Sequence, residues 1–296
     1  MPLQKDKNKI VRFDNLSAWI ETSIIMNDKI NNSRKNFEKL GTVYQMNENV
    51  TISKETIENV SSYWFNSEEF ANSNKLIVYL HGGCFVLGSI QSHQAMVSHV
   101  SEALQTPIFF IEYSLAPEHP FPAALNDVFS VYKHLLLEYP EKDIIFMGDS
   151  AGSGLTLSTL SKINNEGIKV PAYMVLLSPW TNLRCDNDSI TNNAHSDPIL
   201  SKTTLQNFAS MYVNENLLEA NPIENLCGPF PPTLIMVGSG EVLLDDSKNL
   251  YDKIVSEQPN VKLSIYEKQN HVWMLENIHT DASGEALKEI AEFITA

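Results

Sequence analysis

Ser150 lies between two glycines in the stretch GDSAGSGL, residues 148–155, which follows directly on an apolar run. Glycine accepts backbone conformations that other residues avoid, so Gly148 and Gly152 favour a sharp turn at this point. In the pattern G-x-S-x-G, the serine sits on a strained turn between a strand and a helix and presents its hydroxyl to a substrate. We therefore predict that Ser150 is a nucleophile, which requires a base and a carboxylate from elsewhere in the chain.

A carboxylate and a histidine follow two later apolar runs. Glu241 comes shortly after TLIMVG, and His271 comes shortly after KLSIY. A histidine can take the proton of the serine, and a carboxylate can orient that histidine. Asp245 and Asp246 lie nearby, but they resemble first-turn residues of the next helix, where acidic side chains favour the helix dipole. We predict Glu241 as the acid and His271 as the base, with Asp245 as the alternative acid.

A second glycine-rich stretch, HGGCFVLGS at residues 81–89, follows the apolar run KLIVYL. Glycines allow a loop to turn its backbone N–H groups into a cavity, where they can stabilise a developing oxyanion. We predict that the N–H groups of Gly83 and Cys84 do so, together with that of Ala151 after the nucleophile. His81 is interpreted as an anchor of this loop. A phosphate-binding loop is the alternative, but the stretch lacks the G-K-[ST] ending and the G-x-G-x-x-G spacing.

Short apolar runs alternate with segments of helical length through most of the chain. The runs are bounded by Gly, Pro or Asn and are predicted to be strands. This alternation predicts an α/β fold with a mostly parallel central sheet and helices on both faces. Ligands of such sheets bind outside the carboxyl ends of the strands, where the loops described above would lie. The predicted strands are 75–80, 107–113, 143–148, 172–178, 233–238 and 262–266, with an antiparallel edge near 49–55 and 59–66, and the predicted helices are 92–104, 122–138, 150–165, 245–257 and 282–295.

Two regions do not follow this alternation. Residues 12–40 carry apolar side chains at helical spacing before the first strand, and residues 180–221 are polar and irregular before a helical pattern. We predict that residues 1–296 form a single domain, with a cap formed by about 1–45 and 180–221; ordinary packing helices would give the same pattern. The apolar side chains of the two helical patterns are Phe13, Leu16, Trp19, Ile20, Ile24, Leu205, Phe208, Met211 and Tyr212.

Charge and composition narrow the class of protein further. The chain has 296 residues and a formal net charge of −15 at pH 7, which opposes binding to nucleic-acid phosphates and anionic lipids. The start, MPLQKDKNKIVRFD, has no apolar signal core, and no apolar run approaches the ~20 residues that span a bilayer. Cys84, Cys185 and Cys227 form no C-x-x-C pair, which favours a reducing compartment. We expect a cytoplasmic protein that binds a small molecule, does not bind nucleic acid, does not insert stably into a membrane, and uses no metal.

The motifs together resemble the hormone-sensitive-lipase-like family of α/β-hydrolase esterases, the alpha/beta-hydrolase-3 group. The resemblance rests on HGGCFVLGS, YSLAPEHPFPAALND, GDSAGSGL, LLSPWTNL, GEVLLDDS and NHVWML, which span about residues 75–280. It implies the α/β-hydrolase fold, a helical cap, a three-donor oxyanion hole, and a triad in the chain order Ser150, Glu241, His271. Members of the family mostly hydrolyse short-to-medium acyl esters without a cofactor, and they often form homodimers through an edge strand and a helix.

Two positions depart from the family pattern. Cys84 occupies the third glycine of HGGG, although an oxyanion hole uses backbone N–H groups and can tolerate a small side chain. Glu241 replaces the usual aspartate of a D-x-L-x-D string, here EVLLD, and its separation of 30 residues from His271 is the usual one. We therefore expect a serine carboxylesterase with a small-molecule ester as substrate. The alternatives are a lactonase or deacetylase of the same fold, or a non-catalytic ligand receptor.

Overall fold

The computed structural model describes residues 27–213 and 216–295, and its described strands form one eight-stranded sheet with the order β1-β2-β4-β3-β5-β6-β7-β8. The strands are β1 (Thr51–Ile57), β2 (Val60–Asn66), β3 (Lys75–Leu80), β4 (Ile108–Ile111), β5 (Asp143–Asp149), β6 (Tyr173–Leu177), β7 (Thr233–Gly238) and β8 (Val261–Tyr266). The pairs β1–β2 and β2–β4 are antiparallel, and the remaining five pairs are parallel. The prediction of a mostly parallel sheet with an antiparallel edge is therefore confirmed.

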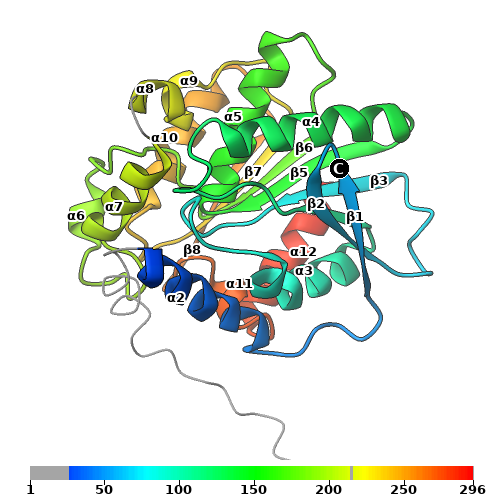
Figure 1. Ribbon diagram of the computed structural model, residues 1–296, viewed down its shortest axis with the longest axis horizontal. Helices are drawn as coiled ribbons and strands as arrows, with labels where there is room; N and C mark the ends of the chain where they lie inside the picture. Colours follow the sequence, from blue (N-terminus) through cyan, green and yellow to red (C-terminus); the bar gives the residue numbers. More distant parts are fainter. Residues whose placement is uncertain (1–26, 214–215, 296) are drawn as a thin grey trace, which may run out of the picture.

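Helices cover both faces of this sheet (Figure 1). One layer consists of α4 (Ala123–Glu138), α5 (Ala151–Asn165) and α10 (Leu244–Val255), and the opposite layer contains α3 (Ile90–Leu104) and α12 (Asp281–Phe293). These five helices and the eight strands begin and end within two residues of the predicted positions.

The side chains of β3 explain why its sequence reads as one continuous apolar run. Successive side chains of a strand point to opposite faces of the sheet. Leu76, Val78 and Leu80 join the core beneath α4 and α5, whereas Ile77 and Tyr79 join the core beneath α3 and α12. Because a central parallel strand is buried on both faces, it shows no alternation of polar and apolar residues.

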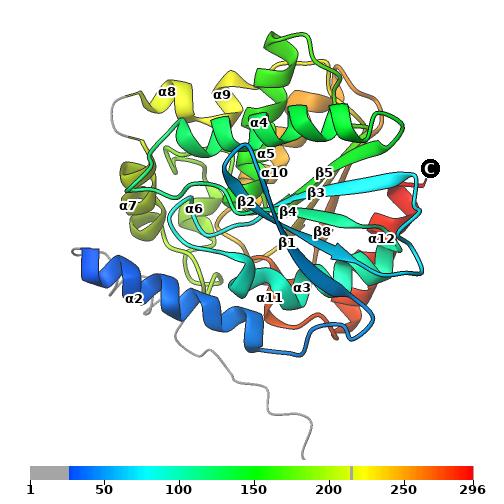
Figure 2. The ribbon, with the colours of Figure 1, turned by 45° about the vertical axis from the view of Figure 1, so that its right-hand side comes forward.

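Additional helices lie outside the two layers. They are α2 (Asn27–Phe37), the short 3₁₀ helix η1 (Glu38–Thr42), α6 (Ser189–Asn192), α7 (Lys202–Tyr212), α8 (Leu217–Ala220), α9 (Pro222–Asn225) and α11 (Trp273–Glu276). Figure 2 shows α2 alongside α3 and α11, with α6 and α7 next to each other. The helical pattern predicted around Leu205 to Tyr212 corresponds to α7, whereas Phe13, Leu16, Trp19, Ile20 and Ile24 lie outside the described residues.

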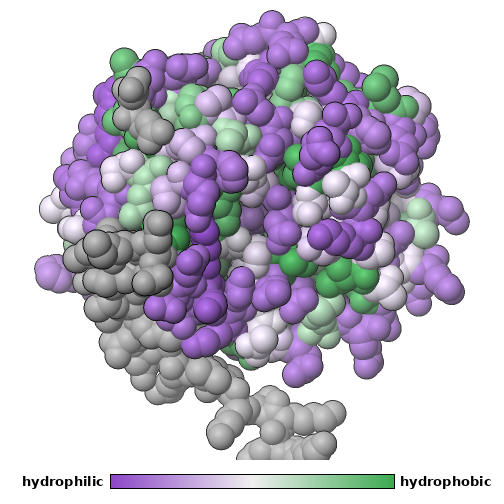
Figure 3. Space-filling view, viewed as in Figure 1, coloured by the Kyte–Doolittle hydropathy of each residue, from purple (hydrophilic) through white to green (hydrophobic). Residues whose placement is uncertain are grey.

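The face in Figure 3 is mostly hydrophilic, with hydrophobic residues in separate patches. Within the part of the chain that the structure describes, no helix is both long enough and apolar enough to cross a membrane.

Candidate active site

Ser150 occupies the turn between the end of β5 and the first residue of α5. Its backbone has φ 51° and ψ −119°, a positive φ that is uncommon for a residue with a side chain and is typical of strained functional turns. The neighbouring strand holds this conformation, because the Ser150 N–H donates to the carbonyl of Leu177 at 2.8 Å, and the Ser150 carbonyl accepts from the N–H of Trp180 at 3.1 Å. The turn is therefore fixed from both sides.

The flanking glycines allow this turn to pack tightly against β3. A Cβ at Gly152 would lie 2.0 Å from the carbonyl oxygen of Leu80, and a Cβ at Gly148 would lie 2.8 Å from the same oxygen. Any side chain at Gly152 would thus force α5 away from β3. Close backbone approach, in addition to the turn itself, explains the glycine at this position.

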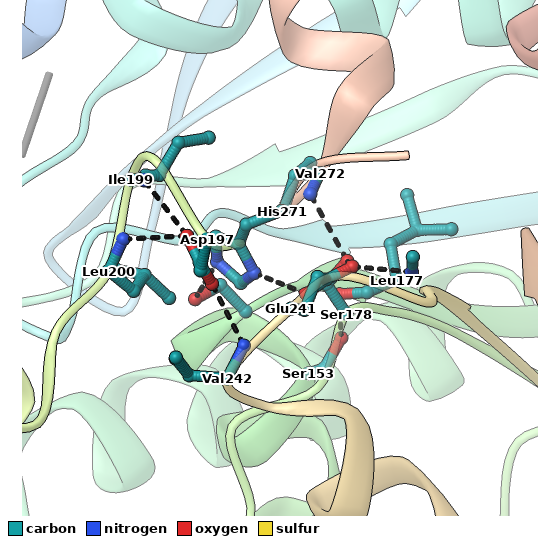
Figure 4. A network of polar contacts seen from close by, with 12 residues as sticks. Ser153, Leu177, Ser178, Asp197, Ile199, Leu200, Glu241, Val242, His271 and Val272 are labelled. Carbon is teal, nitrogen blue, oxygen red and sulfur yellow. Dashed lines mark hydrogen bonds and ion pairs between the residues drawn. The ribbon is translucent and has the colours of Figure 1, made fainter. Parts of the chain in front are cut away.

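His271 links the serine to a carboxylate. Its Nε2 lies 2.9 Å from the Oγ of Ser150, and its Nδ1 lies 2.7 Å from Oε2 of Glu241. His271 and Glu241 point toward each other from the loops after β8 and β7 (Figure 4). Asp245 lies elsewhere, because its Oδ2 accepts from the N–H of Ser189 at 2.7 Å. The structure brings Ser150, His271 and Glu241 together, and it does not bring Asp245 to them.

Ser178 is a member of this network that the sequence analysis missed. Its hydroxyl donates to Oε1 of Glu241 at 2.7 Å and accepts from the N–H of Val272 at 3.1 Å. The N–H of Gly238 donates to the same Oε1. Both carboxylate oxygens are thus engaged, and the residue after His271 is held to the acid through one hydroxyl (Figure 4). Within LLSPWTNL, a lone serine at a strand end carries no pattern that distinguishes it.

Burial and charge act in opposite directions on the pair. Burial lowers the pKa of His271, but the charge of Glu241 and its hydrogen bond outweigh burial, so this pKa lies above the ordinary value. Burial raises the pKa of Glu241, and the hydrogen bonds from His271, Gly238 and Ser178 offset part of the rise. A histidine with a raised pKa accepts a proton readily, provided that the pH keeps it neutral beforehand.

The loop after β3 carries the predicted oxyanion donors. Gly83 and Cys84 both have positive φ, 112° and 56°. Within residues 27–213 and 216–295, the N–H groups of Gly83, Cys84 and Ala151 donate to no protein acceptor. Ala151 is also the first residue of α5, where the helix dipole adds positive potential. Burial raises the pKa of the Cys84 thiol to about 12, so this side chain is neutral and the thiolate that a nucleophile requires does not form.

Asp149 joins the oxyanion loop to the turn at Ser150. Its Oδ1 accepts from the N–H of Gly82 at 3.0 Å and from the hydroxyl of Tyr79 at 2.8 Å. The neighbouring His81 is fully buried, and burial, with the charge of His93 as a second cause, lowers its pKa to about 3. A neutral His81 whose Nδ1 lies 2.7 Å from the carbonyl oxygen of Gly82 is consistent with an anchor of the loop.

A small apolar cavity opens beside Ser150 and His271. Its volume is about 50 Å³, which is room for a few water molecules. Side chains from two regions far apart in the sequence wall it, namely Phe37, Leu40, Ile199, Leu200 and Phe208. Among the residues that the structure describes, no group of three or more His, Cys, Asp or Glu is arranged to hold a metal.

The sheet order, the serine turn after β5 and the histidine after β8 define the class of protein as an α/β hydrolase. A family model described as alpha/beta hydrolase fold, Abhydrolase_3, matches residues 77–275. An esterase of Acinetobacter venetianus is 31% identical over 287 residues, covering 95% of this chain and 94% of the relative. An acetyl-hydrolase of Streptomyces hygroscopicus is 34% identical over 207 residues, covering 67% of this chain and 68% of the relative.

Solved structures of similar proteins indicate the same class of protein. The crystal structure of an esterase from the bacterial hormone-sensitive lipase family superposes with a TM-score of 0.86 at 28% identity, covering 94% of this chain and 95% of that one. The chain therefore belongs to the hormone-sensitive-lipase-like family of α/β hydrolases and is a carboxylic ester hydrolase. The resemblance deduced from its motifs is confirmed.

Proposed function

We propose that the protein is a serine carboxylesterase that cleaves short-to-medium acyl esters through an acyl-enzyme. The observation that carries this proposal is the continuous chain of contacts from Glu241 through His271 to the Oγ of Ser150, which ends at an apolar cavity. Ser150, His271 and Glu241 are all buried. The charge of Glu241 therefore acts on His271 and Ser150 with little screening by bulk water.

Acylation begins when His271 Nε2 takes the proton of Ser150 and the Oγ forms a bond to the ester carbonyl carbon. The carbonyl oxygen becomes an oxyanion, which the free N–H groups of Gly83, Cys84 and Ala151 stabilise. The carbon–oxygen bond to the alcohol then breaks, and the leaving oxygen takes the proton from His271 Nε2. Glu241 orients the imidazole and stabilises its charged form throughout.

Deacylation repeats these steps with water. His271 removes a proton from a water molecule, whose oxygen attacks the acyl carbon bound to Ser150. The second oxyanion occupies the same site, and its collapse returns the proton to the Oγ and releases the carboxylic acid. No cofactor enters this scheme.

The cavity favours small neutral acyl groups. Its volume and apolar walls suit a short hydrocarbon chain, and neither lysine nor arginine is among its described lining residues. The acetyl-hydrolase relative supports a short acyl group. We also propose that the segments around Phe37 to Leu40 and Ile199 to Phe208, which supply the wall, act as the cap over the site.

Hydrolysis of p-nitrophenyl esters from acetyl to palmitoyl tests the proposal. The parent is compared with Ser150→Ala and Glu241→Ala. Ser210→Ala is the matched serine control, because Ser210 lies on the exposed surface of α7. We expect turnover of the short esters and a loss of at least about 10³-fold in kcat for Ser150→Ala. A lactone and an acetylated sugar in the same panel separate a lactonase or deacetylase from a carboxylesterase. A folded parent that hydrolyses none of these substrates would favour a ligand receptor.

A further inference from the structure

Asp197 is a buried carboxylate that belongs to neither the triad nor the oxyanion loop. Its Oδ1 accepts from the N–H groups of Ile199 and Leu200 at 2.8 and 2.9 Å, and its Oδ2 accepts from the N–H of Val242 at 2.9 Å. The side chain is 7% exposed. Figure 4 shows it between the loop segment of Ile199 and Leu200 and the loop that carries Glu241.

The partners of Asp197 are themselves parts of the site. Ile199 and Leu200 line the cavity together with Ser150 and His271. Val242 directly follows Glu241 in the chain and is fully buried. One carboxylate therefore joins the backbone of the cavity wall to the backbone of the triad acid, across a sequence separation of 45 residues.

Asp197 also acts on His271 through its charge. The charged groups that face His271 are Glu241, Asp197 and Asp149, each of which favours the protonated imidazole, and Glu276 interacts with the same imidazole from α11. No lysine or arginine lies among the described lining residues of the cavity to offset them. Glu241 is the hydrogen-bonded partner, so Asp197 adds a field without a direct contact.

We propose that Asp197 is a positioning residue for ester hydrolysis, which fixes the acyl-facing wall relative to Glu241 and stabilises the imidazolium that forms on His271 in the transition state. The inference rests on the proposed function, because it takes His271 as the base. It assigns two separable effects to one side chain. Its geometry sets the acyl preference, and its charge adds to the basicity that Glu241 gives His271.

Two variants separate these effects. Asp197→Asn keeps the size of the side chain but removes its charge and one acceptor, because the amide nitrogen cannot accept from an N–H. Asp197→Glu keeps the charge but displaces the oxygens by one methylene. The matched control is Asp245→Asn. Asp245 is also a carboxylate that accepts from a backbone N–H, that of Ser189, but it does not line the cavity.

For Asp197→Asn we expect kcat/KM on p-nitrophenyl butyrate to fall about 10-fold through misplacement of the wall. The acid limb of the pH profile should move down by about 0.5 pH unit, because a negative charge near His271 has been removed. For Asp197→Glu, the acid limb should stay at the parent value, while the kcat/KM ratio of octanoate to acetate changes about 3-fold or more. Asp245→Asn should match the parent in both measurements.

NMR titration of the His271 imidazole provides a readout that needs no turnover. This titration separates a failure of the inference from a failure of the proposed function, because the charge of Asp197 acts on the pKa of His271 whether or not esters are cleaved. A His271 titration that is the same in Asp197→Asn and the parent, or an acyl preference that is unchanged in Asp197→Glu, overturns the proposal. If Asp197→Asn does not fold, Asp197→Glu alone decides the wall component, and an unchanged acyl preference again refutes it.

Discussion

Replacing Gly152 by alanine tests the packing of the serine turn against β3. The new Cβ would lie 2.0 Å from the carbonyl oxygen of Leu80 and 2.6 Å from that of His81, and both neighbours are backbone atoms that cannot rotate away. Ordinary contact begins at 3.4 Å, so α5 and β3 must separate by more than about 1 Å. Such overpacking costs about 1–3 kcal/mol of the free energy of unfolding, and the rigid backbone on both sides places Gly152→Ala at the upper end.

Gly284 is the matched control, because it is also a helical glycine but an added Cβ would meet no atom within 4 Å. Gly284→Ala should raise the free energy of unfolding by about 0.5–1 kcal/mol, the ordinary helix preference of alanine over glycine. Urea unfolding of both variants measures the difference between a blocked and an open position.

The same substitution should reduce activity. Leu80 and His81 lead into the oxyanion loop, and Gly152 lies two residues after Ser150. A larger distance between α5 and β3 therefore moves Ser150 relative to the oxyanion donors. Misplacement by about 1 Å can cost on the order of 10²-fold in rate. We therefore expect kcat/KM of Gly152→Ala on p-nitrophenyl acetate to fall by about that factor under conditions where the variant is folded. A Gly152→Ala variant as stable and as active as Gly284→Ala would show that the serine turn does not require close packing against β3.

Three further predictions concern the hydrogen bonds and charges of the site. Ser178→Ala removes one donor to Glu241 and should lower kcat about 10-fold with little change in KM; an unchanged kcat would argue against its role in orienting the acid. The pKa of His271 lies above the ordinary histidine value of 6.5 because of the charge of Glu241. Only the neutral imidazole can act as base, so kcat/KM should reach half its maximum above that pH, and a flat profile between about pH 5 and 8 would contradict this assignment. Glu276 lines the cavity as a carboxylate, which repels a negatively charged acyl group. Glu276→Gln should therefore raise the kcat/KM ratio of p-nitrophenyl succinate to p-nitrophenyl butyrate about 3- to 10-fold. An unchanged ratio would show that the charge of Glu276 does not act on the acyl group.

The strands and main helices could be predicted because each shows its environment locally. A run such as KLIVYL is apolar throughout because both faces of β3 are buried. The helices α6, α8, α9 and α11 were missed, since each has four residues and is too short to show a helical period.

Some residues of the candidate site could be predicted from the sequence, and others could not. Ser150 and Gly83 belong to short patterns in which the backbone turn dictates the residue type, so their sequence is informative. Ser178 and Asp197 act through side-chain contacts to Glu241 and Val242, which are 63 and 45 residues away. No spacing rule connects such residues, because only the order of strands in the sheet brings them together.

The extent of the cap, the homodimer and the cytoplasmic location stay predictions from the sequence. The wall residues Phe37 and Phe208 come from the two segments assigned to the cap, and deletion of either segment would change the acyl preference if that assignment is right. Sedimentation of the purified protein as a monomer would dismiss the dimer.

Covalent labelling identifies the nucleophile, which we propose to be Ser150. Diethyl p-nitrophenyl phosphate reacts with an activated serine by forming a phosphate ester at the Oγ and releasing p-nitrophenol. We expect one equivalent of p-nitrophenol per chain, an adduct that peptide mass spectrometry places on Ser150, and a rate that collapses in His271→Ala. An adduct on another residue would show that Ser150 is not the nucleophile, and labelling of Ser150 at the same rate without His271 would show that His271 does not activate it.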